Sequence, residues 1–111
     1  MNGRLPAHLE VAGLIRATEA AGGFAMVLQK GENDAGVILI LTIERGGNSR
    51  LWERMPRLDG TRRFDVVKEQ DPNNLLEFNE YIERRRRQDP DSWLIELDVP
   101  KPARLVAQWG R

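Results

Sequence analysis

The chain has 111 residues, of which 41% are hydrophobic and 31% charged, and this predicts one globular domain over residues 1–111. Seventeen basic and seventeen acidic residues leave a formal net charge of zero, which argues against non-specific nucleic-acid binding, because such binding needs an excess of positive charge. Cysteine is absent, which excludes disulfides, thiolate zinc sites, iron–sulfur clusters and cysteine nucleophiles.

The first predicted element is a helix over residues 6–21. Pro6 suits the first helical position, and Gly22 with Gly23 supplies a left-handed stop. Its apolar stripe repeats at helical spacing and consists of Val11, Leu14, Ile15 and Thr18, whereas Glu10, Arg16 and Glu19 lie away from it. A strand with apolar residues on both faces is predicted over residues 24–29.

Residues 30–36 are predicted to form a connecting loop. Gly31 and Gly36 have the spacing of the glycines in a phosphate-binding loop, but such a loop continues with lysine and a hydroxyl residue and then opens a helix. Here a strand follows, predicted over residues 37–44. Because it is apolar on both faces, we expect it to be central in the sheet and covered on both sides.

Two turns follow the central strand. A hairpin turn over residues 46–49 leads into a strand over residues 50–55, one face of which is expected to be wet. A second turn at residues 58–60 leads into a strand over residues 63–68.

A second helix is predicted over residues 71–87, with Asp71 as its cap and Pro72 at its first position. Its apolar stripe consists of Leu75, Phe78 and Ile82, flanked by Leu76 and Tyr81. A strand with alternating apolar and polar residues follows over residues 92–99, and residues 103–109 form either a short helix or a draped tail.

These elements predict an α+β fold with a mainly antiparallel five-stranded sheet, two helices and the order α-β-β-β-β-α-β. The end segments, residues 1–5 and 100–111, are candidates for loosely packed tails.

Four consecutive arginines end the second predicted helix: Arg84, Arg85, Arg86 and Arg87. Cations are favourable at this position because of the helix dipole. Glu80 and Glu83 lie four residues before the first and the last of them, in the favourable order for ion pairs. We therefore interpret the run as a solvated, internally paired helix end in which Arg85 and Arg86 are the less compensated members.

Contact with an anion or a partner is the alternative interpretation of this run. Its candidate residues are Arg84, Arg85, Arg86 and Arg87, together with Arg62 and Arg63. Nucleic-acid binding, which is not favoured, requires these guanidinium groups to converge on one face.

No catalytic constellation is predicted, and we lean toward a protein that is not an enzyme. His8 is the only histidine and lies in the first turn of a helix, without the partners that a nucleophile–base pair needs. A magnesium-dependent, nuclease-like hydrolase is a less favoured alternative, suggested by the element order alone. It would use Asp34 and Glu44 as metal ligands, but Arg45 and Gly46 follow Glu44 where such enzymes have x-Lys. No cofactor and no metal are expected.

The three tryptophans, Trp52, Trp93 and Trp109, are interpreted as core residues rather than as a partner surface. Among them Trp109 is expected to be the most exposed.

Two stretches, residues 20–31 (AAGGFAMVLQKG) with residues 34–36 (DAG), and residues 89–97 (DPDSWLIEL), resemble the signatures of domain-of-unknown-function family 1491. Residues 51–54 (LWER) between them agree with the family as well. Its members are short bacterial proteins, mostly from alphaproteobacteria. The resemblance implies no activity, cofactor or catalytic residue. It implies architectural roles: Gly22 and Gly23 as a helix stop, Asp89 and Pro90 as a helix breaker, and Trp93 as a core aromatic.

We therefore expect a non-catalytic binding or adaptor role, through Arg85, Arg86 and exposed strand edges. The partner is another protein or a second copy joined through an edge strand. The start of the chain lacks the apolar core of a signal peptide, and the longest apolar run, residues 37–41, is far shorter than the ~20 residues that cross a bilayer. The expected location is the cytoplasm, without a membrane partner.

Overall fold

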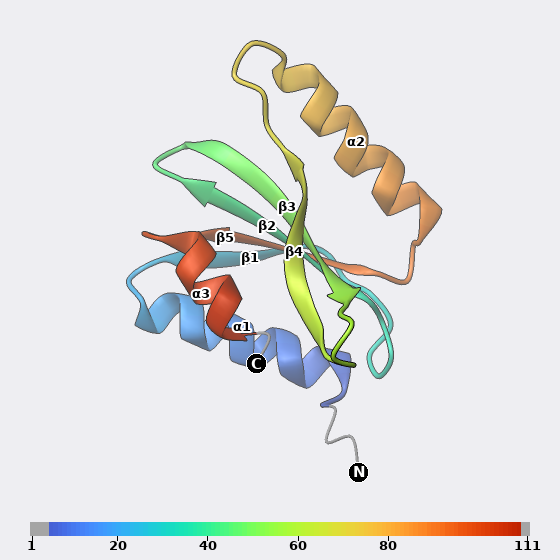
Figure 1. Ribbon diagram of the computed structural model, residues 1–111. Coiled ribbons are helices and arrows are strands. Elements are labelled where there is room, and N and C mark those ends of the chain that lie inside the picture. Colours follow the sequence, from blue (N-terminus) through green and yellow to red (C-terminus); the bar gives the residue numbers. More distant parts are fainter. Residues whose placement is uncertain (1–4, 110–111) are drawn as a thin grey trace.

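The computed structural model describes residues 5–109, so that most of the predicted loose segment 1–5, and residues 110 and 111, lie outside the described residues. Within this range three helices and five strands form in the order α1 (Ala7–Ala20), β1 (Phe24–Gln29), β2 (Ile38–Glu44), β3 (Gly47–Pro56), β4 (Arg62–Glu69), α2 (Leu75–Gln88), β5 (Trp93–Asp98) and α3 (Pro102–Trp109) (Figure 1). The predicted order is confirmed through β5.

The strands form one sheet in the order β1-β5-β2-β3-β4. Antiparallel hairpins join β2, β3 and β4, whereas β5 lies between β1 and β2 and runs parallel to β2. The α+β class and the five-stranded sheet are thus confirmed, but the sheet is mixed and three helices are described rather than two. β5 takes an inner position because Leu94, Ile95 and Leu97 are fully buried and need cover on both faces.

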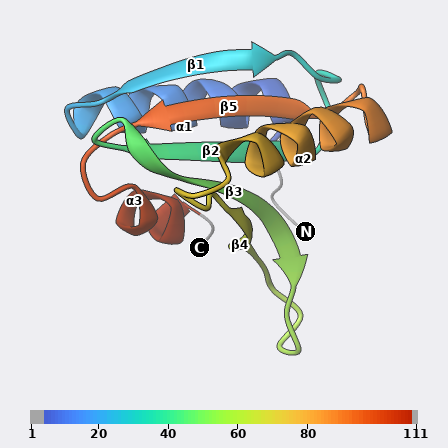
Figure 2. The same ribbon diagram turned by 90° about the horizontal axis from the view of Figure 1, so that it is seen from above.

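Helices cover the two faces of the sheet unequally. α1 and α3 lie on one face, and α2 lies on the other (Figures 1 and 2). The larger core, between the sheet and α1 with α3, includes Leu14, Ile40 and Val106. The smaller core packs Phe78 and Ile82 of α2 against strand leucines. Figure 2 shows that α2 crosses only part of its face.

The end of α1 follows the predicted glycine stop. Gly22 has φ +88°, its N–H donates to the carbonyl of Glu19, and the N–H of Gly23 donates to the carbonyl of Thr18, both at 3.0 Å. These two bonds close a Schellman motif. At the other end Pro6 is the N-cap residue rather than the first helical residue.

The hairpin between β2 and β3 turns at Arg45 and Gly46, which have φ values of 54° and 76°. Positive φ at both central residues is the requirement of a type I′ turn, so that the turn lies just before the predicted residues 46–49. The prediction of a wet face on β3 is wrong. Leu51 and Trp52, which point to opposite faces, are 0% and 7% exposed, because helices cover both sides of the sheet at this point.

α2 begins later than predicted. Asn74 caps it by accepting from the N–H of Glu77, whereas the carboxylate of Asp71 accepts from Asn73 in the preceding turn. The predicted buried position of Leu75 is wrong, since this side chain is 51% exposed.

Residues 102–109, for which the sequence left a helix and a draped tail open, form α3. Its Val106 is fully buried in the larger core, and the indole of Trp109 packs over Gly13 of α1. Among residues 5–109, no helix combines the length and the apolarity that a membrane span requires.

Candidate functional site

The two stretches that carry the family resemblance face each other across the β1–β5 pair. Ala25 lies opposite Leu97, and Met26 opposite Glu96, in this register. Beyond β1, the N–H of Glu32 donates to the carbonyl of Asp91, and the indole N–H of Trp93 donates to the carbonyl of Glu32, both at 2.8 Å. The loop after β1 is thereby fixed to the start of β5.

Three glycines in this region have no room for a side chain: Gly23, Gly31 and Gly36, where a Cβ would lie 2.6 Å from the carbonyl oxygen of Glu32. A Cβ on Gly31 would lie 2.3 Å from the carbonyl oxygen of Asp91, and a Cβ on Gly23 would lie 2.5 Å from that of Asp98. The backbone of β5 and of the residues just before it cannot move away cheaply. These contacts explain why the stretches that carry the resemblance have glycine at these positions: the glycines have a structural role.

The carboxylate of Glu32 is bound within its own loop. It accepts from the N–H groups of Asp34 and Ala35 at 2.7 and 2.6 Å. These bonds, the one from Ala35 foremost, lower the pKa of Glu32 below its usual range. The loop between the two glycines is thus closed around one of its own carboxylates, and its interpretation as a connection is supported.

Arg85 and Arg86 are both held by neighbouring strands. Arg85 donates to the two carboxylate oxygens of Glu53 at 3.0 and 3.1 Å, and hydrogen bonding to Glu53 raises the pKa of Arg85. Arg86 donates to the side-chain oxygen of Gln29 at 3.0 Å. The prediction that these two arginines are the less compensated members of the run is therefore wrong, because β3 and β1 supply partners distant in sequence.

The predicted pairs at a spacing of four residues do not form. Glu83 pairs instead with Arg86, three residues later, at 3.1 Å. Arg84 lies over the ring of Tyr81, 6.0 Å from its centroid. Within residues 5–109, Arg84 and Arg87 make no ion pair.

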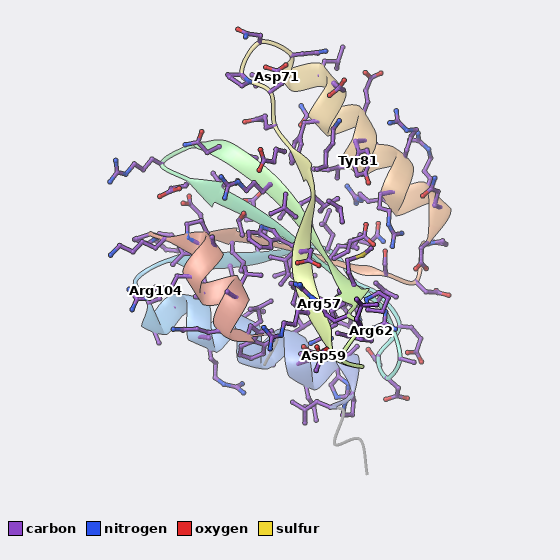
Figure 3. All side chains as sticks on the ribbon, viewed as in Figure 1. Arg57, Asp59, Arg62, Asp71, Tyr81 and Arg104 are labelled. Atoms are coloured by element: carbon purple, nitrogen blue, oxygen red, sulfur yellow. The ribbon has the colours of Figure 1, made fainter. Side chains whose placement is uncertain are left out.

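Arg62 and Arg63 do not join this run on one face. They are neighbours on β4, so their side chains point to opposite faces of the sheet, and Arg62 lines a cavity on the α1 side. Figure 3 shows Arg62 well apart from Tyr81, which marks the middle of α2. The convergence that nucleic-acid binding requires is absent for Arg62.

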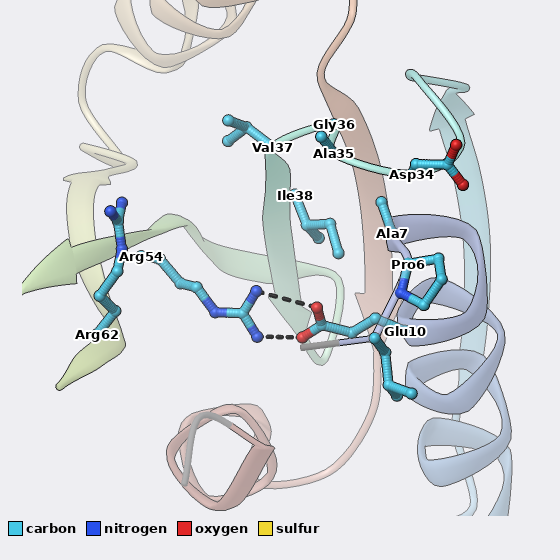
Figure 4. Close-up of a pocket in the computed structure, with 11 residues that line it drawn as sticks. Pro6, Ala7, Glu10, Asp34, Ala35, Gly36, Val37, Ile38, Arg54 and Arg62 are labelled. Carbon is cyan, nitrogen blue, oxygen red and sulfur yellow. Dashed lines mark hydrogen bonds and ion pairs between the residues drawn. The ribbon is translucent and has the colours of Figure 1, made fainter. Parts of the chain in front are cut away.

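The cavity beside α1 is lined by Glu10, whose carboxylate accepts three hydrogen bonds. The volume of this cavity is about 510 Å³. In Figure 4, the side chain of Arg54 on β3 extends to Glu10 on α1. Its two terminal nitrogens, Nη1 and Nη2, donate to the two carboxylate oxygens. Trp109 donates its indole N–H to the same carboxylate at 3.1 Å, and Phe64 lies under the guanidinium, 4.7 Å away.

This arrangement joins three elements and leaves neither carboxylate oxygen free to bind another group. Glu10 is 9% exposed, and three donors occupy its two oxygens. A general base needs a carboxylate that can reach a substrate proton. The pair therefore acts as a structural contact between α1, β3 and α3. The sequence reasoning missed it because it placed Glu10 on the polar side of the helix.

The carboxylates proposed for magnesium lie at opposite ends of β2. Asp34 precedes the strand and Glu44 is its last residue, and seven extended residues span about 20 Å. No group of three acidic, histidine or cysteine side chains suitable for a metal is found in the described part of the chain. The nuclease-like arrangement is not formed.

The other chemically notable residues are structural. His8 is exposed, with Nδ1 3.0 Å from the carbonyl oxygen of Asn33. Trp52 and Trp93 are buried, as predicted, and Trp109 is the most exposed of the three, also as predicted.

The two edges of the sheet differ in charge. β4 carries charged side chains at Arg62, Arg63, Asp65, Lys68 and Glu69, and charges on an edge strand oppose pairing with another chain. β1, with the sequence FAMVLQ, carries none. One edge of the sheet is therefore protected by charge and the other is not, although the pairing of β1 with β5 shifts between Val27 and Gln29 and such an irregularity also opposes edge pairing.

Apolar side chains are also exposed at the unprotected edge. Phe24 and Met26 are 78% and 59% exposed, and they pair with Asp98 and Glu96 of β5. This register places them on the face that α2 covers elsewhere, because Glu96 also pairs with Leu41, which packs against α2. We call Phe24, Met26, Glu96 and Asp98 the β1 surface.

Solved structures of similar proteins share this fold. A crystal structure of a DUF1491 family protein from Caulobacter crescentus is 36% identical, with 86% of this chain and 88% of that chain covered and a TM-score of 0.74. A solution structure of a protein from A. tumefaciens is 31% identical, with 94% and 93% covered and a TM-score of 0.75. An NMR structure of a C. crescentus DUF1491 family protein is 33% identical, with 92% of each chain covered and a TM-score of 0.74.

No curated protein matches the chain. The family model described as "Protein of unknown function (DUF1491)" matches residues 5–107, which include both stretches that carry the resemblance. The chain belongs to the DUF1491 family.

Proposed function

We propose that this protein is a non-catalytic binding or adaptor protein whose contact surface is the β1 surface. The observation that carries the proposal is the unprotected edge of β1 together with the exposed side chains of Phe24 and Met26. Sheets in natural proteins usually block their edges with charge, proline, a bulge or a covering element. β4 is blocked by its charged side chains, whereas β1 carries only the register shift between Val27 and Gln29.

The chemistry of an open edge favours an extended partner segment. Such a segment adds to the sheet through main-chain hydrogen bonds, and its alternate side chains supply specificity. Phe24 and Met26 lie on one face beside this edge, where they pack against a partner strand and lose their contact with water. Each Å² of apolar surface that these side chains bury against the partner contributes about 25 cal/mol to the free energy of binding.

The engaged state of the charged groups supports a non-catalytic role. Glu10 and Arg54 bind each other, Arg85 binds Glu53, and Glu32 is bound by its own loop. These groups stabilise the fold through the contacts that they make.

Site-specific photo-crosslinking tests the proposal. The photoreactive residue p-benzoylphenylalanine replaces Met26 on β1 or, as the matched control, Arg63 on β4, and the cells of origin are irradiated. We expect crosslinked products of higher mass from position 26 and none from position 63. Absence of products from position 26, or equal yields from both, contradicts the proposal.

A further inference from the structure

We infer that the groove between the C-terminal part of α1 and α3 binds an anionic amphiphile, a small molecule with a carboxylate at one end and an alkyl chain behind it. The groove has a volume of about 680 Å³, within the range of about 300–1,000 Å³ that small-molecule sites occupy. It lies on the face of the sheet that α1 and α3 cover, and no residue of the β1 surface lines it. The inference is therefore independent of the proposed function.

The charge of the groove is positive. Lys101 and Arg104 line it, and no acidic residue does. Both side chains are exposed, and neither makes an ion pair within residues 5–109. Figure 3 shows Arg104 beside the C-terminal end of α1. Two unpaired cations in one groove favour an anionic ligand, and a guanidinium binds a carboxylate through two parallel hydrogen bonds.

The neighbouring acids do not compensate these two cations. Glu10 is paired with Arg54. Glu19 follows the lining residue Ala17 by two positions, which turns it about 200° around α1, away from the groove. Asp98 belongs to the β1 surface on the other face of the sheet. The positive charge of the groove is therefore available to a ligand.

The remainder of the groove is mainly apolar. Ala17 and Ala20 of α1 form one wall, and Leu105 and Trp109 of α3 form the other. The cations lie at the start of α3 and Trp109 at its end, and the eight residues of this helix span about 12 Å. An alkyl chain of medium length fits along these walls while its carboxylate meets the cations.

The backbone at Lys101 supports a role for its side chain. Its φ of 52° lies in the left-handed region, which glycine adopts without the steric cost that a lysine meets. Non-glycine residues in this conformation cluster at ligand-binding and active sites. The ammonium group in the groove is what a lysine adds at this position.

Isothermal titration calorimetry of the full chain tests the inference, with decanoate as the probe. We expect saturable binding of decanoate in the millimolar range or below. Decanol, which has the alkyl chain without the charge, is expected to bind about tenfold more weakly, and acetate, which has the charge without the chain, is expected not to bind.

Four variants separate the charge from the shape of the groove. Lys101→Asn and Arg104→Gln each remove one cation, and asparagine tolerates the left-handed backbone; we expect each to bind decanoate about tenfold more weakly. Ala20→Leu keeps both cations and fills part of the groove, and we expect it to weaken binding as well. The matched control is Arg87→Gln, which removes an exposed cation from α2 and is expected to bind as the unchanged chain does. Circular dichroism confirms that each variant is folded.

Absence of saturable decanoate binding, equal affinity for decanol, or variants at positions 101 and 104 that bind like the unchanged chain, overturns the inference. Met26→Lys separates this outcome from that of the proposed function, because it alters the β1 surface and leaves the groove intact. We expect it to bind decanoate normally. Loss of binding in Met26→Lys but not in Arg104→Gln places decanoate at the β1 surface and refutes the groove as its site.

Discussion

Replacing Glu10 by leucine removes the carboxylate that joins α1, β3 and α3. Arg54, whose side chain is 22% exposed, then loses both of its carboxylate bonds, and the indole of Trp109 loses its acceptor. Breaking a fully buried pair costs about 3–5 kcal/mol, and the residual exposure reduces this to ~3 kcal/mol. With an unfolding entropy of about 0.23 kcal/mol/K for a chain of 111 residues, the midpoint of thermal unfolding falls by about 13 °C.

A double-mutant cycle separates this electrostatic cost from a loss of packing. Arg54→Met alone leaves an uncompensated carboxylate on Glu10 and costs about 2 kcal/mol. The double variant Glu10→Leu with Arg54→Met has an apolar pair in the same place, and we expect its stability to lie within about 1 kcal/mol of the unchanged protein. Urea denaturation of all four proteins measures the cycle. A double variant as unstable as Glu10→Leu, or a cost below ~1 kcal/mol for that single change, refutes the reasoning.

Three further changes test the architecture. Gly31→Ala forces a Cβ against the carbonyl of Asp91, and we expect a loss of about 1–3 kcal/mol in urea denaturation; an unchanged midpoint contradicts this contact. Trp52→Phe removes the 2.9 Å bond from the buried indole N–H to the hydroxyl of Thr42, and we expect a loss of about 1–2 kcal/mol, whereas a neutral change shows that the bond is dispensable. The lowered pKa of Glu32 means that the ionised carboxylate holds its loop at pH values above the ordinary carboxylate range and that the loop loosens as the pH falls below that range. The protection of the loop amides, which is their exchange rate relative to the intrinsic rate at the same pH, measures this, and Glu32→Gln must abolish the change of protection with pH.

Local sequence patterns predicted the elements well. Helical spacing with a double glycine defined α1, and the apolar run of β2 placed it correctly in the centre of the sheet. These features follow from interactions between residues near in sequence, which a pattern can display. The resemblance identified the family correctly. The residues that carry it are the ones that fix the loop after β1 to the start of β5.

The sequence patterns did not reveal the contacts between segments that are far apart along the chain. Nothing near Arg85 shows that Glu53, 32 residues away, faces it, and so the pairing was sought within the helix. Leu75 has the spacing of a buried residue, yet it is exposed because α2 crosses only part of the sheet. The parallel placement of β5 likewise depends on which strand needs cover on both faces.

The candidate surface was predictable only in kind. An edge strand was expected to be open, but which strand forms the edge depends on the insertion of β5 between β1 and β2. Once that order is known, the contrast between FAMVLQ and the charged sequence of β4 identifies the unprotected edge.

Amide hydrogen exchange in the two edge strands tests the account most directly. The unchanged protein is compared with Met26→Lys in an extract of its cells of origin, which contains the proposed partner. We predict that the outward N–H groups of β1 exchange more slowly in the unchanged protein than in the variant, while β4 exchanges equally in both. Equal exchange of β1 in the two proteins, or slowed exchange at β4 instead, contradicts the assignment of β1 as the strand to which a second chain adds.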